Sequence, residues 1–495
     1  MERLHEACGI VGIYTQTCNE KHIDVRRYIT LALSALQHRG QESAGMAVYD
    51  SAGKIVHRVG MGKVREIFSD SGTGLPETTR GIGHVRYSTT GSSCVENAGP
   101  FVANTDIDQY QPIAVAHNGD LVNGAALREQ LPRELLQSTT DSEAIAWLLM
   151  HADGASLRER MIMVFPFLRG SYSLVILAQG KLYAMRDPWG IRPLCLGRIG
   201  ASWIIASESC ALDRVGADYI REVEPGELIT IDEQGLHSDI LVHLPRQSLC
   251  VFEYIYFSDA TSQLNGRYVY DVREALGREL ALEHPVEADL VVPVPDSSIP
   301  AALGYATASG IPYGQAIIKN RYSDRTFIKP DQRLRQLEVD LKFNLVKPKI
   351  AGARLVIVDD SIVRGNTMKR LVAALRHQGV REIHLRSSSP PLRHPCYFGI
   401  DIPQEDELIA ANRSVQEIAD YIGVDSLGYL SIAGLGRAIE AAGGAASVSD
   451  DEAARSSLHK EFCYGCMARQ GWPFDPIQAR SITARRLDSV TRGVQ

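Results

Sequence analysis

The chain has 495 residues, which at roughly 150 residues per domain predicts more than one folding unit. Apolar residues make up 45% of the chain and charged residues 22%, so the composition excludes a wholly disordered, collagen-like or coiled-coil protein. The formal net charge of −7 argues against a surface that binds nucleic acid or anionic lipid as a whole. Any site for a polyanion should therefore be local.

The N-terminus and the cysteines bear on the compartment. Residues 1–7, MERLHEA, contain two acids and no apolar core, and no stretch of the chain approaches the ~18 apolar residues of a membrane-spanning helix. We expect no signal peptide, no membrane anchor and a cytoplasmic protein. In a reducing compartment the nine cysteines are more often metal ligands, a nucleophile or core residues than disulfides.

Residues 8–243 show the pattern of an α+β domain. Short apolar or alternating runs predict strands, and a period of 3.6 residues predicts helices, one of which can be capped by Asp141 or a neighbouring threonine. The predicted strands include 44–49, 113–116, 172–178 and 181–185, and the predicted helices are 25–36 and 142–150.

Residues 244–440 show a different rhythm, in which helices and apolar strands alternate. A helix over 269–283 precedes a strand over 289–294 and a helix that is opened by Pro300 and closed near Gly310. Such alternation predicts an α/β domain with a parallel sheet. Residues 441–457 contain few bulky apolar side chains and are expected to be a flexible linker, and 458–495 a C-terminal segment with a loose tail.

The segment 355–367, LVIVDDSIVRGNT, predicts an anion site. A buried strand ends in Asp359 and Asp360, and a short loop then leads into a helix. At the carboxyl end of a strand, loop N–H groups and a helix N-terminus form a phosphate nest, while carboxylates suit ribose hydroxyls or Mg²⁺. An ordinary capped turn is the alternative for this segment taken alone.

Two further segments favour the anion site. Residues 294–298, VPDSS, again end an apolar strand in a small polar loop before a helix. Residues 319–344 contain seven basic and four acidic residues, a net charge of +3 on an acidic chain. A loop with this charge suits a polyanion, although a solvated charged loop is the alternative.

VIVDDSIVRGNT resembles the phosphoribosyl pyrophosphate (PRPP) motif of type I phosphoribosyltransferases, and with KNRYSDRTFI it resembles the glutamine PRPP amidotransferase family. The similarity extends over about residues 8–470. The resemblance implies that Asp359 and Asp360 hold the ribose and Mg²⁺, with Ser297 at the Mg²⁺-pyrophosphate. It also implies that the 5′-phosphate lies in the loop formed by Arg364, Gly365, Asn366 and Thr367.

Cys8 begins an apolar strand, CGIVGI, directly after the polar heptapeptide. If residues 1–7 are a propeptide that is removed, Cys8 gains a free α-amino group, whose reference pKa near 8 suits a general base for its own thiol. A buried strand cysteine is the alternative for this segment taken alone.

Four later blocks, LQHRGQE, GHVRYST, HNGDL and TDSE, resemble the glutaminase domain of N-terminal-nucleophile amidotransferases. The resemblance implies an αββα sandwich in which the glutamine carboxylate is bound by Arg86 with Thr89 and the ammonium by Asp141. It implies an oxyanion hole formed by the Asn118 side chain and the Gly119 N–H. Arg39 is a weaker candidate near the nucleophile, and His84 and His117 are expected to be structural.

Cys463 and Cys466 form a CxxC pair that can share a metal centre but needs further ligands. The amidotransferase family has a subgroup with a [4Fe-4S] cluster, and resemblance to it implies Cys250 and Cys396 as the other two ligands. A four-cysteine zinc site is the alternative, because the number of thiolates does not distinguish the two metals.

The combined resemblance predicts an enzyme that converts PRPP, glutamine and water to 5-phosphoribosylamine, glutamate and pyrophosphate, the first committed step of purine synthesis. It implies Mg²⁺ and the cluster as cofactors, purine nucleotides as inhibitors and a homo-tetramer, without a nucleic-acid or membrane partner. A PRPP-sensing regulator and another N-terminal-nucleophile amidotransferase are the alternatives. Asp340 and the run SDATS at 258–262 depart from the family pattern, which bears on PRPP affinity rather than on the reaction.

Overall fold

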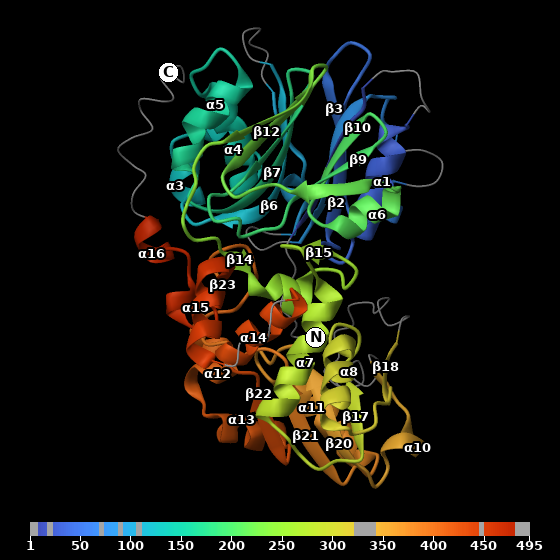
Figure 1. Cartoon of the computed structure of the whole chain (residues 1–495). Coiled ribbons are helices and arrows are strands. Elements are labelled where there is room, and N and C mark those ends of the chain that lie inside the picture. The colour runs from blue at the N-terminus through green and yellow to red at the C-terminus, as the bar shows by residue number, and fades with distance from the viewer. Residues whose placement is uncertain are drawn as a thin grey trace.

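The computed structural model describes residues 8–16, 23–68, 74–87, 93–104, 111–320, 343–444 and 450–480. Figure 1 shows two layered units, with the N-terminal half of the chain at the top and the C-terminal half at the bottom. Within the described ranges, no helix has the length and apolar character needed to cross a membrane.

The first unit contains two antiparallel sheets. The seven-stranded sheet has the order β11-β9-β10-β1-β4-β2-β3 and the six-stranded sheet the order β13-β12-β8-β7-β6-β5. The strands of the first sheet are β1 (Gly9–Tyr14), β2 (Ser43–Tyr49), β3 (Ile55–Met61), β4 (Arg80–Arg86), β9 (Cys195–Ile199), β10 (Ser202–Ala206) and β11 (Asp218–Glu222). Those of the second are β5 (Phe101–Ala103), β6 (Ile113–Leu121), β7 (Gly170–Ala178), β8 (Lys181–Arg186), β12 (Glu227–Asp232) and β13 (Gly235–Ile240).

The two sheets pack face to face and helices cover their outer faces. One buried cluster joins Ile10 and Ile82 of the first sheet to Val175 and Leu177 of the second. The covering helices are α1 (Val25–Ala35), α2 (Val64–Ile67) and α6 (Ser209–Val215) on the first sheet, and α3 (Gly124–Arg128), α4 (Asp141–His151) and α5 (Leu157–Val164) on the second. The expected αββα sandwich is confirmed.

Local sequence explains where the site helices begin. The Asp24 carboxylate accepts from backbone N–H groups at the start of α1, and the Thr140 hydroxyl accepts from the Glu143 N–H at the start of α4. These contacts satisfy N–H groups that have no partner inside the helix. The threonine, rather than Asp141, therefore caps α4, which leaves the Asp141 carboxylate for other contacts.

The second unit has a four-stranded parallel sheet of order β17-β20-β21-β22, as expected. α11 and α13 pack on one face, while α7, α8 and α14 belong to the cluster on the other. The strands are β17 (Leu290–Pro293), β20 (Arg354–Asp359), β21 (Glu382–Ser387) and β22 (Ser426–Tyr429), and the helices are α7 (Val269–Glu283), α8 (Ile299–Ser309), α11 (Asn366–His377), α13 (Val415–Ile422) and α14 (Ile432–Ala442). Short elements are β15 (Gln263–Leu264), β16 (Arg267–Tyr268), β18 (Ile317–Lys319), β19 (Phe343–Leu345), α10 (Lys347–Ile350) and α12 (Ile409–Asn412).

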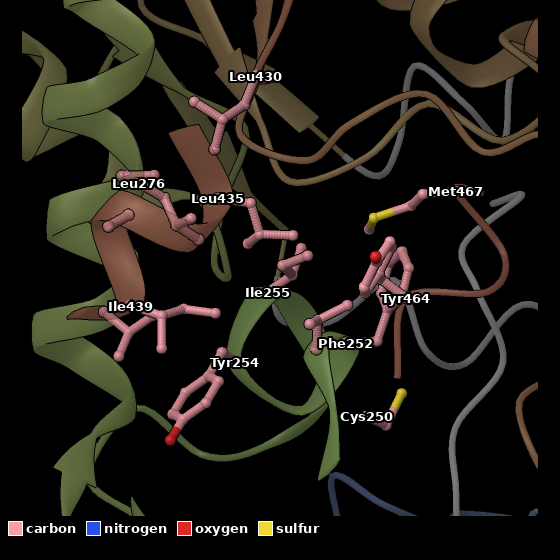
Figure 2. Packing of buried hydrophobic residues seen from close by; sticks show 14 of the residues in the cluster. Cys250, Phe252, Tyr254, Ile255, Leu276, Leu430, Leu435, Ile439, Tyr464 and Met467 are labelled. Carbon is pink, nitrogen blue, oxygen red and sulfur yellow. The ribbon is translucent and has the colours of Figure 1, made fainter. Parts of the chain in front are cut away.

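The C-terminal segment packs against the junction between the units. β14 (Leu249–Cys250) and β23 (Phe462–Cys463) pair in parallel, and a π-helical turn, Glu253–Phe257, follows β14. In Figure 2, Tyr464 and Met467 lie beside Phe252 and Ile255 in one apolar cluster. This packing brings the two ends of the second half together.

The prediction of a flexible linker over 441–457 is wrong for its last part. α15 (Asp451–Glu461) begins after Asp450, which accepts from the Glu452 N–H, and it buries Ala454 and Leu458. A Cβ on Gly436 of α14 would lie 2.6 Å from the Ala454 carbonyl oxygen, so small residues let the two helices approach closely. A shortage of bulky side chains was therefore a sign of close packing here. Residues 445–449 and 481–495 lie outside the described ranges.

Candidate active sites

Cys8 directly precedes β1 at the centre of the seven-stranded sheet. Its Sγ lies 3.7 Å from the carbonyl oxygen of Tyr87, which follows β4. Burial raises the pKa of the Cys8 thiol, although this hydrogen bond and the nearby Arg86 and Arg39 act in the opposite direction. The thiol therefore stays protonated at neutral pH, and a nucleophilic role requires a base that takes its proton.

Three charged side chains act on Cys8 from different elements. The Arg39 Nε donates to the Cys8 carbonyl at 3.0 Å, and Arg86, the last residue of β4, is 4% exposed. Asp141, the first residue of α4, accepts from the Leu121 N–H at 2.9 Å. The structure thus brings Arg86 and Asp141 to the predicted nucleophile, while Thr89 lies outside the described residues.

Asp141 and His117 form a buried pair. His117 Nδ1 lies 3.7 Å from an Asp141 oxygen and 3.0 Å from the Ser142 hydroxyl. Burial alone would raise the pKa of Asp141, but His117 lowers it below its usual value. Asp141 therefore carries a negative charge that can bind an ammonium group, and His117 has a specific partner in the site.

Asn118 and Gly119 lie next to each other in β6. The Asn118 side chain is fully buried, and neither its Nδ2 nor its Oδ1 has a hydrogen-bond partner among the described residues. Gly119 has a φ of +149°, and a Cβ there would lie 2.1 Å from the Ser171 carbonyl oxygen. Because leaving a buried amide unpaired costs roughly 1–3 kcal/mol, the Asn118 side chain points to a bound ligand.

The acid pair of the second unit stands at the carboxyl edge of its parallel sheet. β17 and β20 are neighbours, so the loops that follow them meet. Ser297 Oγ donates to Asp360 Oδ2 at 2.5 Å, and Ser298 Oγ donates to Asp359 Oδ1 at 3.4 Å. The structure therefore brings together Ser297, Asp359 and Asp360, as predicted.

The predicted phosphate loop leads into α11. Gly365 has a φ of +77° and precedes the first helical residue, Asn366, whose side-chain oxygen accepts from the Tyr421 hydroxyl at 2.6 Å. The Arg364 guanidinium is hydrogen-bonded to Glu407. Beside the loop is a cleft of about 380 Å³, which is lined by Arg364, Asn366, Asp406, Glu407, Leu408, Ile409, Asn412, Arg413 and Tyr421. The basic loop is described only as far as Asn320 and from Phe343 onward.

The four predicted cluster cysteines come from three segments. Cys250 lies opposite Cys463 in the parallel pair β14–β23, and the Arg393 and His394 N–H groups both donate to the Cys466 carbonyl. Burial raises the pKa of Cys466, and the charges of the other three thiolates act in the same direction. Among the residues described, no three His, Cys, Asp or Glu side chains are close enough to hold a single metal ion.

Comparison with known proteins covers both halves of the chain. Residues 90–214 match a glutamine amidotransferase domain and residues 266–388 a phosphoribosyl transferase domain. The chain is 47% identical over 440 residues to amidophosphoribosyltransferase of Methanothermobacter thermautotrophicus, which spans 87% of this chain and 90% of that protein. The corresponding Bacillus subtilis enzyme is 42% identical over 434 residues, with 87% and 89% covered. The chain belongs to the amidophosphoribosyltransferase family.

The solved structures agree with this family. The Bacillus subtilis glutamine PRPP amidotransferase complexed with ADP and GMP matches with a TM-score of 0.85 at 39% identity, over 96% of this chain and 100% of that one. The amidophosphoribosyltransferase reaction converts PRPP, glutamine and water to 5-phosphoribosylamine, glutamate and pyrophosphate, the first committed step of purine biosynthesis. The two alternative functions considered above are thereby excluded.

Sequence reasoning missed a buried charge network at the junction of the two amidophosphoribosyltransferase domains. Arg39 pairs with Glu208 at 2.5 Å and with Glu253 at 2.9 Å, and Arg192 pairs with Glu253 at 3.1 Å. All four side chains have an exposed fraction of 0%. The only signal in the sequence was a charged residue inside an apolar run, as in CVFEYIYF, since charged residues are rarely buried unless they are paired.

Proposed function

We propose that Cys8 is the nucleophile of the glutaminase reaction. Its thiol attacks the side-chain amide of glutamine, and the Asn118 amide and the Gly119 N–H donate to the oxygen that becomes negative. The unpaired, fully buried Asn118 side chain is the observation that carries this proposal. The oxyanion then collapses to a thioester as ammonia leaves with the thiol proton.

The α-amino group of Cys8 is the proposed proton carrier. Removal of residues 1–7 would expose this amine next to a thiol whose pKa burial raises, so a base with a reference pKa near 8 is well matched to it. Arg86 with Thr89 would bind the carboxylate of glutamine, and Asp141 its ammonium group. These contacts orient the amide toward the sulfur.

The second reaction takes place at the acid pair. The donor set, two carboxylates and a hydroxyl from Asp359, Asp360 and Ser297, fits Mg²⁺ because hard oxygen ligands suit this cation. Bound Mg²⁺ would neutralise charge on the departing pyrophosphate. The two carboxylates would also accept hydrogen bonds from the ribose hydroxyls, which fixes the sugar for attack by ammonia at the anomeric carbon.

The loop before α11 is the proposed 5′-phosphate site. The backbone N–H groups of Gly365, Asn366 and Thr367 lie at the N-terminus of a twelve-residue helix, where an anion is favoured. Arg364 is held by Glu407, so an arriving phosphate would exchange for that carboxylate.

A structural [4Fe-4S] cluster on Cys250, Cys396, Cys463 and Cys466 is proposed as the second cofactor. The thiols converge without approaching the spacing of ligands around one ion, which favours a cluster, in which each thiolate binds a different iron, over zinc. The Phe398 N–H donates to Cys396 Sγ at 3.3 Å, a contact that stabilises a thiolate ligand. The cluster would tie the domain junction to the C-terminal segment.

Three finer properties complete the proposal. Purine nucleotides would inhibit the enzyme, which the ADP and GMP in the related Bacillus subtilis structure support. We also propose a homo-tetramer and a cytoplasmic location.

Cys8→Ala tests the division of labour between the two sites. The variant should lose glutamine-dependent synthesis by about 10³-fold or more, because no nucleophile remains, and keep synthesis from added ammonium. Pyrophosphate release with each nitrogen donor measures both activities. N-terminal sequencing of the active wild type should begin at Cys8. Loss of both activities in a folded variant, or full activity in protein that retains Met1, would contradict the proposal.

A further inference from the structure

Glu253 belongs to the π-helical turn at the start of the second half of the chain, yet its carboxylate is buried among residues of the first unit. Its Oε1 and Oε2 each accept a hydrogen bond from Arg39 at 2.9 Å. Arg39 in turn donates to the carbonyl oxygen of Cys8 at 3.0 Å. A two-point contact of this kind fixes the plane of the guanidinium, and therefore the direction of the Nε that holds the nucleophile residue.

The same carboxylate holds a second arginine. Arg192 Nη1 donates to Glu253 Oε1 at 3.1 Å, and the other nitrogens of Arg192 donate to the Phe398 carbonyl at 3.0 and 2.5 Å. Both side chains are fully buried. Glu253 thus fixes the segment around Phe398 through Arg192.

The segment around Phe398 touches the oxyanion strand. The Ser171 hydroxyl donates to the Phe398 carbonyl at 2.9 Å and accepts from the Asp120 N–H at 3.1 Å. A Cβ on Gly399 would lie 3.0 Å from the carbonyl carbon of Gly119, so the two backbones are in contact. Phe398 therefore rests on the residues that surround the Gly119 N–H.

From these two arms we infer that Glu253 is a positioning residue of the glutaminase, which sets the distance between the Cys8 backbone and the oxyanion strand although it belongs to the other half of the chain. The inference rests on Cys8 as the nucleophile. Glu253 touches neither substrate, and its effect passes through Arg39 on one side and through Arg192 on the other.

The surrounding charges keep Glu253 ionised. Burial alone would raise the pKa of Glu253, but Arg39 and Arg192 lower it below its usual value. Glu208 shares Arg39, so two arginines face two carboxylates inside the protein. A neutral side chain at position 253 would keep the shape but weaken the hold on both arginines, because charged hydrogen bonds are roughly twice as strong as neutral ones.

Ser258 offers a milder way to disturb the same carboxylate. Its hydroxyl donates to Glu253 Oε2 at 2.7 Å, while Arg273 Nη2 donates to the Ser258 carbonyl at 2.8 Å. Removing this hydroxyl leaves both arginine contacts in place and takes away one hydrogen bond that orients the carboxylate.

Glu253→Gln, Ser258→Ala and the control Glu227→Gln test the inference in the full-length enzyme. Glu227 is also fully buried and pairs with Arg221 at 2.6 Å, but it contacts neither Arg39 nor Arg192. We expect Glu253→Gln to lower kcat for glutamine hydrolysis about tenfold or more, with KM for glutamine and ammonium-dependent synthesis within about twofold of wild type. Ser258→Ala should lower the same kcat by about two- to fivefold, and Glu227→Gln should change none of these values.

The outcomes separate positioning from a general structural role. A wild-type kcat in folded Glu253→Gln, an equal fall in both activities, or a rise in KM at constant kcat would overturn the inference. If Glu253→Gln does not fold, Ser258→Ala decides: a fall confined to glutamine-dependent kcat supports the inference, and no change overturns it. Glutamine-dependent activity in Cys8→Ala would instead refute the nucleophile assignment, whereas an inactive Cys8→Ala beside a wild-type Glu253→Gln refutes only the role of Glu253.

Discussion

The two active sites of this chain are built in opposite ways. The glutaminase site is enclosed between two antiparallel sheets, and Cys8, Asn118 and Asp141 come from three separate elements whose side chains are largely or fully buried. The PRPP site stands at the open edge of a parallel sheet, and most of its residues belong to one strand, loop and helix, 354–377.

This difference separates two sources of precision. In the enclosed site the side chains are held by distant partners, such as His117 for Asp141 and Glu253 for Arg39. In the open site they are held by neighbours, such as Ser361, which donates to Asp360 at 2.8 Å. Damage to the first site should therefore follow from changes far away in the sequence, and damage to the second from changes within the motif.

The largest effect should come from the acid pair. Asp359→Asn or Asp360→Asn should reduce synthesis by about 10³-fold, equivalent to about 4 kcal/mol of barrier, because a ligand for Mg²⁺ and the ribose loses its charge. Pyrophosphate release should fall equally with glutamine and with ammonium. The control Asp420→Asn, at an exposed position of α13, should be unaffected. Retained synthesis in either acid-pair variant would show that the site lies elsewhere.

Asn118→Ala should affect only the enclosed site. Loss of one oxyanion donor typically costs about 10²–10³-fold, so glutamine-dependent synthesis should fall by that factor while ammonium-dependent synthesis is unchanged. The contrast with the acid-pair variants is the measurement, made with both nitrogen donors on the same preparations. Equal loss from both donors would mean that Asn118 supports the fold rather than the oxyanion.

Cys463→Ser should weaken the junction rather than either reaction. Because metal binding that closes long loops becomes part of the folding free energy, we expect loss of iron and a stability lower by several kcal/mol. Iron content, anaerobic urea unfolding and resistance to protease measure this, with Cys94→Ser as a control outside the four cysteines. Stable, fully active Cys463→Ser protein would reject the site, and zinc in equal amount to protein would correct the metal.

The smallest effect concerns the pair of His38 Nε2 and Glu208 Oε1, 2.8 Å apart. Burial alone would lower the pKa of His38, but Glu208 raises it above the usual value. The stabilisation is therefore fully present below the unfolded pKa of about 6.5 and is lost as the pH rises through the higher folded pKa. Unfolding from pH 5.5 to 8.5 should show this loss in wild type and not in His38→Gln. Identical pH profiles would exclude the pair as its source.

The sequence by itself determined the local parts of this protein. The strand, acid pair, glycine and helix of 354–377 follow in one uninterrupted run, and the cap of α4 was readable from a threonine before an acidic turn. These features depend on turn chemistry and side-chain periodicity within a few residues, which any isolated stretch of sequence contains. Resemblance to the family supplied the roles of residues that lie far apart.

Only the tertiary structure decided which charges meet inside the protein. Arg39 and Glu253 are 214 positions apart, and no periodicity relates them. The close approach of α15 to α14, hidden behind a composition that suggested a linker, was decided in the same way. Long-range pairs of this kind form because a buried charge or a small-residue surface needs a matching partner, and that partner is supplied by how the sheets and helices pack rather than by its place in the chain.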